Sequence, residues 1–160
     1  VEFSPVYQDL RTVSDAYNTE LETKMLSARF DTKNGRLDKL DLLKLFSVQP
    51  VSKYFRIGWE SGGVLEAGIG TGMIKHGFSV YAVPMVGTRD SRIFAGLKTG
   101  GVLHLADKAK FIAEYETATD TDKFTAYAGI KVHANTELYI QYEHRHACAD
   151  RTVVGAAVYF

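Results

Sequence analysis

The segment of the sequence with the clearest capacity for chemistry lies close to its C-terminal end. His144, His146 and Cys148 occupy alternate positions there. If this segment continues a β-strand, the three side chains share one face, because side chains alternate along a strand. Imidazole and thiolate groups bind soft metals such as zinc. The spacing is unusual for a structural zinc site and the chain has no second cysteine, so we expect a partly exposed rim with no metal and no cofactor.

Charged side chains at alternate positions of strand-like segments form the second candidate site. We expect them to point into the narrow interior of a β-barrel, where opposite charges must pair because an unpaired buried charge costs several kcal/mol. The preferred interpretation is a network of ion pairs that largely plugs the lumen, and a narrow polar conduit is the alternative. The expected lumen network consists of Arg56, Glu60, Glu66, Arg92, Lys98, Lys110, Glu114, Glu116, Lys131, Glu137, Glu143 and Arg145.

A third candidate is the glycine-rich run from Gly68 to Gly72. A glycine-rich phosphate loop needs a helix after it, but this run lies inside a segment that alternates between apolar residues and glycines. We therefore interpret its glycines as small inward-facing residues that leave room for bulky side chains opposite.

The elements that would position these residues are ten predicted strands. Turn residues such as Asn34-Gly35 separate them, and they follow one another without room for helices, which favours hairpins over βαβ units. We predict an all-β fold: an antiparallel up-and-down transmembrane β-barrel of about ten strands over 21–160, with eight strands as the alternative. Residues 1–20 are expected to form an N-terminal segment at the periplasmic rim or in the lumen. The predicted strands are 21–31, 37–46, 51–60, 63–74, 77–86, 92–105, 108–117, 123–133, 136–146 and 151–160.

The transmembrane part of this prediction rests on alternation. In 51–60, Phe55, Ile57 and Trp59 share one face, while the other face mixes charge, tyrosine and glycine. No apolar run approaches the ~20 residues of a membrane helix, but alternating strands of about 9–11 residues can span a bilayer. Aromatic residues of the apolar face gather near strand ends, as two girdles at the lipid–water interfaces would. One predicted girdle contains Trp59, Tyr115, Phe124 and Tyr142, and the other contains Phe78, Phe111 and Phe160.

Composition excludes some classes of function. The 160 residues include 19 basic and 19 acidic ones, so the charge balance favours neither nucleic acid nor an acidic substrate as a partner. The single cysteine excludes an internal disulfide. The sequence begins at Val1, so we expect that an exported chain has already lost its signal peptide.

The last ten residues resemble the C-terminal assembly signal of Gram-negative outer-membrane β-barrels. They end on Phe160, with Val158 two residues earlier and Gly155 five residues earlier, although Val153 stands where the signal usually has a polar residue. The resemblance implies a location in the outer membrane of a Gram-negative bacterium and contact with its lipid and lipopolysaccharide. It also implies insertion by the barrel-assembly machinery through the C-terminal strand. The oligomeric state stays open.

A repeated hairpin pattern is similar to the rhythm of the same barrels. The runs 95–98 and 128–131 each read alanine, glycine, an apolar residue and lysine, and each is followed by a turn and a strand that ends in Tyr-Glu. With the C-terminus on the periplasmic side, we expect the turns near 47–50, 75–76, 106–107 and 134–135 to be periplasmic.

The run 142–147 resembles the late strand of outer-membrane lipid A deacylases, which carry His-x-Ser-Asn and an acidic partner on the last strand. Here His146 stands at the serine position and Ala147 at the asparagine position, so no nucleophile remains in the motif. We therefore expect a small integral outer-membrane barrel with a structural, surface-interaction or porin-like narrow-pore role, more in keeping with a non-enzyme than with an enzyme. The alternatives are a lipid A-modifying hydrolase and a soluble β-barrel that binds an apolar ligand.

Overall fold

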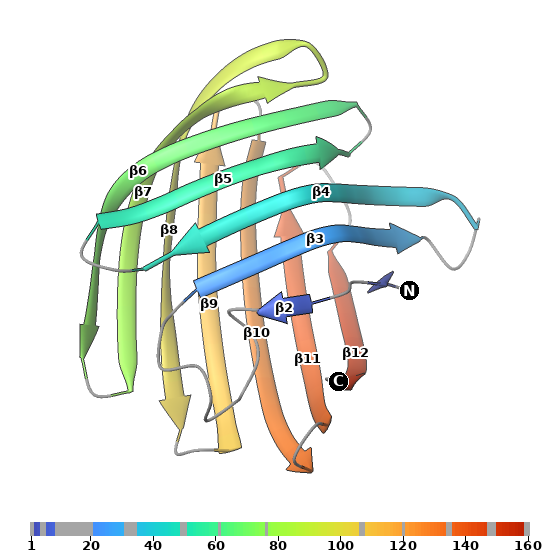
Figure 1. Ribbon diagram of the computed structural model, residues 1–160, viewed down its shortest axis with the longest axis vertical. Coiled ribbons are helices and arrows are strands. Elements are labelled where there is room, and N and C mark those ends of the chain that lie inside the picture. The colour runs from blue at the N-terminus through green and yellow to red at the C-terminus, as the bar shows by residue number, and fades with distance from the viewer. Residues whose placement is uncertain are drawn as a thin grey trace.

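The computed structural model has a single antiparallel β-sheet of twelve strands (Figure 1). It describes residues 2–3, 6–8, 21–30, 35–48, 51–60, 62–75, 77–105, 108–119, 121–133, 136–146 and 150–158. In this part of the chain, no helix is long and apolar enough to cross a membrane. The strands are β1 (Glu2–Phe3), β2 (Val6–Gln8), β3 (Leu21–Phe30), β4 (Leu37–Ser47), β5 (Val51–Trp59), β6 (Gly63–Lys75), β7 (Phe78–Arg89), β8 (Arg92–Leu105), β9 (Ala109–Ala118), β10 (Thr121–His133), β11 (Thr136–Arg145) and β12 (Arg151–Val158).

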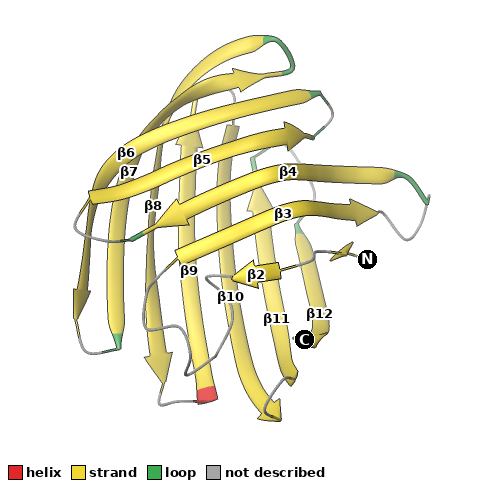
Figure 2. Cartoon of the chain, viewed as in Figure 1, coloured by secondary structure: helices red, strands yellow, loops and turns green. Residues whose placement is uncertain are grey.

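The ten long strands β3 to β12 form an up-and-down meander in which each strand pairs with its neighbours in sequence. The prediction of ten antiparallel strands is confirmed, and the alternative of eight is wrong. Strands make up nearly all of the described chain, with short loops between them (Figure 2). The short strands β1 and β2 fall within the N-terminal segment 1–20, and both pair antiparallel with β3.

The β7–β8 hairpin extends further than the sequence predicted. The pattern placed the end of the strand at residue 86 because Gly87 is a turn-forming residue, but Gly87 continues the β7–β8 ladder. The turn is formed instead by Asp90 and Ser91, whose φ angles are 49° and 62°. Positive φ at both positions is what a type I′ hairpin turn requires. Arg89 therefore belongs to the sheet.

The sheet curves round, but its two ends are not joined by backbone hydrogen bonds. β12 pairs with β11, and no described strand pairs with its other edge. The edge of β3 that faces away from β4 is occupied by β1 and β2. The fold thus differs from the predicted closed barrel at one seam, between β12 and β3. The physical reason is that β1 and β2 bind the backbone groups of β3 that β12 would need.

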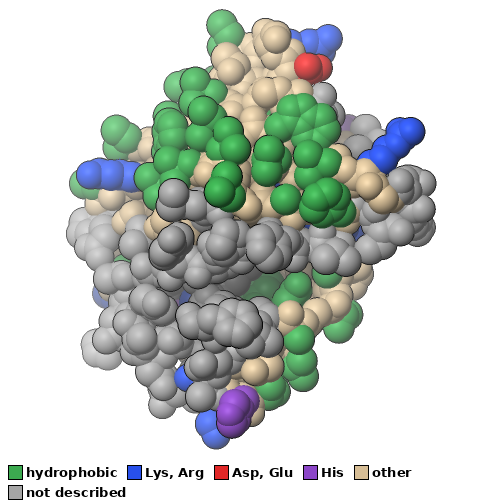
Figure 3. Space-filling view, turned by 45° about the vertical axis from the view of Figure 1, so that its right-hand side comes forward, with side chains coloured by type: hydrophobic (Ala, Val, Ile, Leu, Met, Phe, Trp, Pro, Cys, Tyr) green, Lys and Arg blue, Asp and Glu red, His purple; other side chains and the backbone are tan. Residues whose placement is uncertain are grey.

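Side chains of the sheet alternate between an interior that holds charged groups beside apolar ones and an exterior with many large apolar side chains. Along β6, Glu66 is 0% exposed while Ile69 is 70% exposed. Along β8, Lys98 is 2% exposed while Ile93 is 85% exposed. Figure 3 shows hydrophobic side chains gathered on the outer surface. Because burial of an unpaired charge is costly, the charged groups of the interior need partners.

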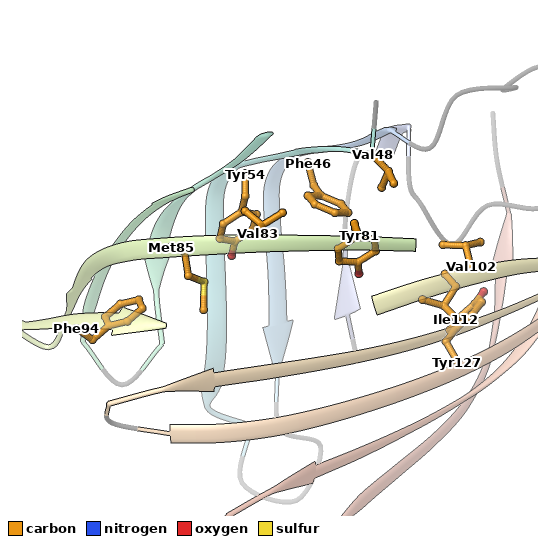
Figure 4. Packing of buried hydrophobic residues seen from close by; sticks show 10 residues of the cluster. All are labelled: Phe46, Val48, Tyr54, Tyr81, Val83, Met85, Phe94, Val102, Ile112 and Tyr127. Atoms are coloured by element: carbon orange, nitrogen blue, oxygen red, sulfur yellow. The ribbon is translucent and has the colours of Figure 1, made fainter. Parts of the chain in front are cut away.

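An apolar cluster fills part of the interior beside the charged groups. Phe46 of β4 packs edge-on against Tyr81 of β7, with ring centroids 4.6 Å apart. Tyr81 lies over Gly100 of β8, where a Cβ atom would come within 2.5 Å of the tyrosine hydroxyl. A glycine on one strand thus makes room for a tyrosine from the next. The cluster (Figure 4) contains Phe46, Val48, Tyr54, Tyr81, Val83, Met85, Phe94, Val102, Ile112 and Tyr127.

A matched irregularity in β3 and β4 changes which residues face inward. Leu26 of β3 has a φ of 53° and is 61% exposed. In β4, the pairing with β5 shifts between Asp41 and Leu43. As a result, Asp41 and Phe46 are both buried, although strict alternation would place them on opposite faces.

β7 carries a proline in its interior. Pro84 is exposed on the outer face and lies opposite Leu97 of β8. On the other side, the β6–β7 ladder has register pairs up to Gly68 with Met85 and again from Thr71 with Ala82, but none between them. Because proline has no N–H to donate, it interrupts the ladder at this point.

Gly70 of β6 is the position where we expect an added methyl group to be least tolerated. Its Cβ atom would collide with the Ala82 carbonyl oxygen and lie 2.6 Å from the Val83 Cα atom. These are backbone atoms that cannot turn away, so we expect Gly70→Ala to lower the free energy of unfolding by about 1–3 kcal/mol.

Gly63→Ala on the same strand is the matched control for this prediction. No atom lies within 4 Å of the Cβ position at Gly63, so we expect its free energy of unfolding to change by no more than about 0.5 kcal/mol. Urea titration measures both variants, and equal effects would mean that β6 and β7 do not approach closely at Gly70.

Candidate functional site

The centre of the polar interior is Arg56 of β5. Its guanidinium group lies 2.6 Å from Asp41 Oδ1, 2.9 Å from Glu60 Oε2 and 3.7 Å from Glu66 Oε1. Lys39 Nζ adds a contact of 3.2 Å to Asp41 Oδ2. One buried cation is therefore surrounded by carboxylates from β4, β6 and the end of β5. This arrangement compensates for the loss of water that burial causes.

Glu66 connects this centre to the next strands. It accepts hydrogen bonds of 2.6 Å from the Tyr54 hydroxyl and from Arg89 Nη2. Arg89 Nη2 also lies 3.1 Å from Glu116 Oε1, and its guanidinium carbon is 4.6 Å from the centroid of the Phe94 ring. Arg89 thus joins carboxylates of β6 and β9 across the interior.

Lys98 and Glu114 form an ion pair between β8 and β9. The Tyr81 hydroxyl donates a 2.6 Å hydrogen bond to Glu114 Oε2. Lys98 Nζ also lies 3.8 Å from Glu116 Oε2. Ion pairs therefore connect the strands from β4 to β9, and each charge in this series has a partner of opposite sign.

A second group of charges lies at the end of the sheet that contains the β5–β6 turn. Glu143 of β11 lies 2.7 Å from Arg145 Nε and 3.4 Å from Lys123 Nζ. Arg145 Nη2 lies 2.6 Å from Glu60 Oε1, which joins this group to Arg56. Burial alone would raise the pKa of the Glu60 carboxyl, but the surrounding cations hold that pKa well below its usual range.

Tyrosines donate to buried or half-buried carboxylates at three places in the interior. Two are the pairs with Glu66 and Glu114, and the third is the Tyr127 hydroxyl with Glu137. Tyr139 stacks on Tyr127 with ring centroids 5.6 Å apart, and its hydroxyl lies where a Cβ atom at Gly155 would be only 2.6 Å away. Glycine positions thus allow rigid rings to fill the interior.

Most of the residues predicted for the lumen network lie in the interior, but they do not form one cluster. Eight take part in the ion pairs above: Arg56, Glu60, Glu66, Lys98, Glu114, Glu116, Glu143 and Arg145. Lys110 and Glu137 are buried elsewhere, and Lys131 is half-buried. Arg92 does not join the interior: it is exposed, because it directly follows the Asp90–Ser91 turn.

Sequence reasoning missed several members of the network. Arg29, Lys39 and Asp41 lie beside the irregularity in β3 and β4, which hides their face from a strict alternation of period two. Arg89 lies beyond the predicted end of its strand, and Lys123 is the first residue of the predicted strand 123–133 but was not included in the network. Extending the alternation of Tyr81, Val83 and Met85 by two steps would have found Arg89.

The residues predicted for the aromatic girdles lie on the outer face where the structure describes them. Tyr115 pairs with Phe124, and Tyr142 packs beside Phe124 with centroids 6.5 Å apart. At the other end, Phe78 and Phe111 both pair with the same residue of β8. Phe160 lies outside the described residues. Among the girdle residues that the structure describes, those with exposed side chains are Trp59, Phe78, Phe111, Tyr115 and Phe124.

The rim segment brings together three polar groups. The Tyr142 hydroxyl donates a 2.7 Å hydrogen bond to Asp150 Oδ2, and His144 Nδ1 lies 2.5 Å from Asp150 Oδ1. The hydrogen bond from Tyr142, and then that with His144, lowers the pKa of Asp150. Cys148 lies outside the described residues, and within them no three potential metal ligands come together.

The interior and the rim differ in what they can do chemically. The interior holds charges in fixed pairs, which favours a plug over a site that must bind and release a ligand. The rim offers an imidazole oriented by a carboxylate, on the outer face. No protein-family model matches the chain, and no curated protein matches it, so function has to be argued from these two arrangements.

Proposed function

We propose that this chain is a small integral protein of a Gram-negative outer membrane, in which the ten long strands close into a transmembrane barrel with a largely plugged lumen. In this proposal its role is structural, or lies in surface interaction, with conduction limited by the plug. The observation that carries it is the inverted distribution of side chains, with ion pairs inside and large apolar side chains outside.

Exposed apolar residues supply the first support. Ile69, Ile93 and Val154 are 70%, 85% and 77% exposed, and they belong to three different strands of the curved sheet. Exposed apolar side chains on so many strands indicate contact with another apolar phase. A hydrocarbon bilayer covers such a surface from every side, whereas one protein partner covers only a part of it.

The interior supports the same proposal against the soluble alternative. A soluble β-barrel for an apolar ligand would line its interior with apolar side chains and place its charges outside. Here Glu66, Lys98 and Glu137 are among the most buried side chains of the described chain. The C-terminal resemblance implies three partners: membrane lipid, lipopolysaccharide and the barrel-assembly machinery. The proposal of these partners depends on the membrane location.

We expect the protein to insert into phosphatidylcholine vesicles. We also expect its mobility on detergent gels to differ between boiled and unboiled samples. A closed barrel keeps its backbone hydrogen bonds in detergent, so it should remain compact until heated. Flotation of the vesicles and gel mobility with and without boiling measure the two effects. A folded protein that stays in the aqueous fraction would rule out the membrane proposal.

A lipid-ester hydrolase is the second candidate, favoured only by the His144–Asp150 contact on the outer face. A carboxylate that orients an imidazole is half of a general-base arrangement. The mass of lipid A before and after expression tests it, with His144→Asn as the control. Equal masses in all samples would remove this candidate and leave the membrane proposal untouched.

A further inference from the structure

One edge of β3 has two possible partners within this chain. β1 lies along it, with Glu2 paired to Arg29 and Phe3 paired to Ala28, and β2 pairs with the other half of the strand. The opposite edge of β3 is bound to β4. Since a strand has only two edges, β12 cannot pair with β3 while β1 and β2 remain in place.

β12 nevertheless begins beside the same end of β3. Arg151 Nη1 lies 3.1 Å from Asp38 Oδ2. Asp38 is the second residue of β4, close to the end of β3. Arg29 Nη1 lies 3.9 Å from Glu143 Oε2 on β11, and Glu143 is the register partner of Arg151. These two ion pairs cross the seam, so side chains already hold the start of β12 next to the end of β3.

A pairing of β12 with β3 that starts at these residues would keep both faces of the sheet intact. Arg29 and Arg151 both form an ion pair with Asp38, so their side chains lie on the same face of the sheet. One residue later in β12 and one residue earlier in β3, Thr152 would lie opposite Ala28 on the outer face. Ala28 is the residue that now pairs with Phe3. The two partners therefore compete for the same backbone groups.

We propose that β12 displaces β1 and β2 from β3 when the sheet enters a bilayer, which rests on the membrane location proposed above. In water the free edge of β12 is solvated, but in hydrocarbon every unpaired backbone group costs several kcal/mol. β1 and β2 contain 2 and 3 residues, whereas β12 contains 8, so only β12 can satisfy most of β3. Before insertion, β1 and β2 cover an edge that would otherwise pair with other chains.

The competition can be tested inside one full-length molecule. In a Cys148→Ser background, the variant Phe3→Cys/Ala28→Cys/Thr152→Cys gives residue 28 a choice between two disulfide partners. Facing residues of an antiparallel pair are close enough for a disulfide. After insertion into phosphatidylcholine vesicles and mild oxidation, we expect the 28–152 disulfide to exceed the 3–28 disulfide at least about tenfold, as the cost of an unpaired edge in hydrocarbon implies. Peptide mapping by mass spectrometry measures the ratio.

The other outcomes overturn the proposal in distinguishable ways. An inserted, heat-modifiable protein with mainly the 3–28 disulfide would mean that β1 remains on β3, and a 3–152 disulfide would mean that β1 is an additional strand between β3 and β12. Either result contradicts strand exchange and the closure of the ten long strands on one another, but leaves the proposed membrane location standing. A variant that does not float with vesicles, when the Cys148→Ser parent does not float either, would instead contradict the membrane location. If only the triple variant does not float, the variant Ala28→Cys/Thr152→Cys is tested in its place. After insertion and oxidation, its 28–152 disulfide would support strand exchange and its absence would contradict it.

Discussion

Replacing Ile69 with arginine is expected to lower the free energy of unfolding in phospholipid vesicles by about 2–4 kcal/mol, the effect of a cation at the middle of a bilayer. Ile69 is the middle residue of β6 and is 70% exposed on the outer face. If that face contacts lipid, the guanidinium group loses its hydration without gaining a partner. Urea titration of the vesicle-inserted protein measures the change.

Ile93→Arg is the matched control for depth. Ile93 is even more exposed, at 85%, but it is the second residue of β8, next to the β7–β8 turn. An arginine there would reach the lipid–water interface, so we expect a cost of only about 0–1 kcal/mol. In a protein surrounded by water, both substitutions replace an exposed apolar side chain by a solvated one. Two equally small effects would therefore contradict the lipid-facing exterior.

Removing the carboxylate of Glu66 is expected to lower the free energy of unfolding by about 3–5 kcal/mol, the usual effect of breaking a buried pair by removing one partner. Glu66 is 0% exposed and accepts from Tyr54 and Arg89 while lying 3.7 Å from Arg56. Glu66→Ala would thus remove the carboxylate that connects Arg56 to Arg89, and it would remove the acceptor of the buried Tyr54 hydroxyl.

The same variant tests the plug in planar bilayers. We expect the unmodified protein to give no large, steady current, because its charges are paired across the interior. Glu66→Ala should raise the conductance by releasing Arg89 to move, while Glu66→Gln, which keeps the acceptor oxygen, should raise it less. Asp150→Ala at the exposed rim is the control and should leave stability and current unchanged. A stable porin-sized current from the unmodified protein would contradict the plugged lumen.

The sequence predicted the meander because its signals are local. Alternation in β6 and β10 and turn residues between the strands are set by neighbours a few residues apart, and the ten strands appear nearly where they were expected. The inward position of Glu66 and the outward position of Ile69 follow from the same period of two. Alternation cannot indicate which charges meet, because Arg56 and Asp41 come from different strands whose register is a property of the whole sheet.

Two parts of the structure depend on information that a local pattern lacks. The positive φ of Leu26 and the shifted pairing beside Asp41 change which residues of β3 and β4 face the interior. No turn residue in the sequence indicates these two irregularities. The pairing of β1 and β2 with β3 joins the N-terminal segment to an edge whose other candidate partner is the last strand of the chain. Competition between distant segments for one edge is a tertiary effect that single-segment propensity does not contain.

The interruption at Pro84 has a consequence for the timescale on which the sheet opens. It divides the β6–β7 ladder into one block that ends at Gly68 and Met85 and another that begins at Thr71 and Ala82 and runs to the hairpin turn. Cooperative opening passes along continuous hydrogen-bonded pairs, so the turn-side block can open without the other. Its amide protons should therefore exchange with deuterium at a rate independent of the block that pairs Val64 with Arg89 and Gly68 with Met85.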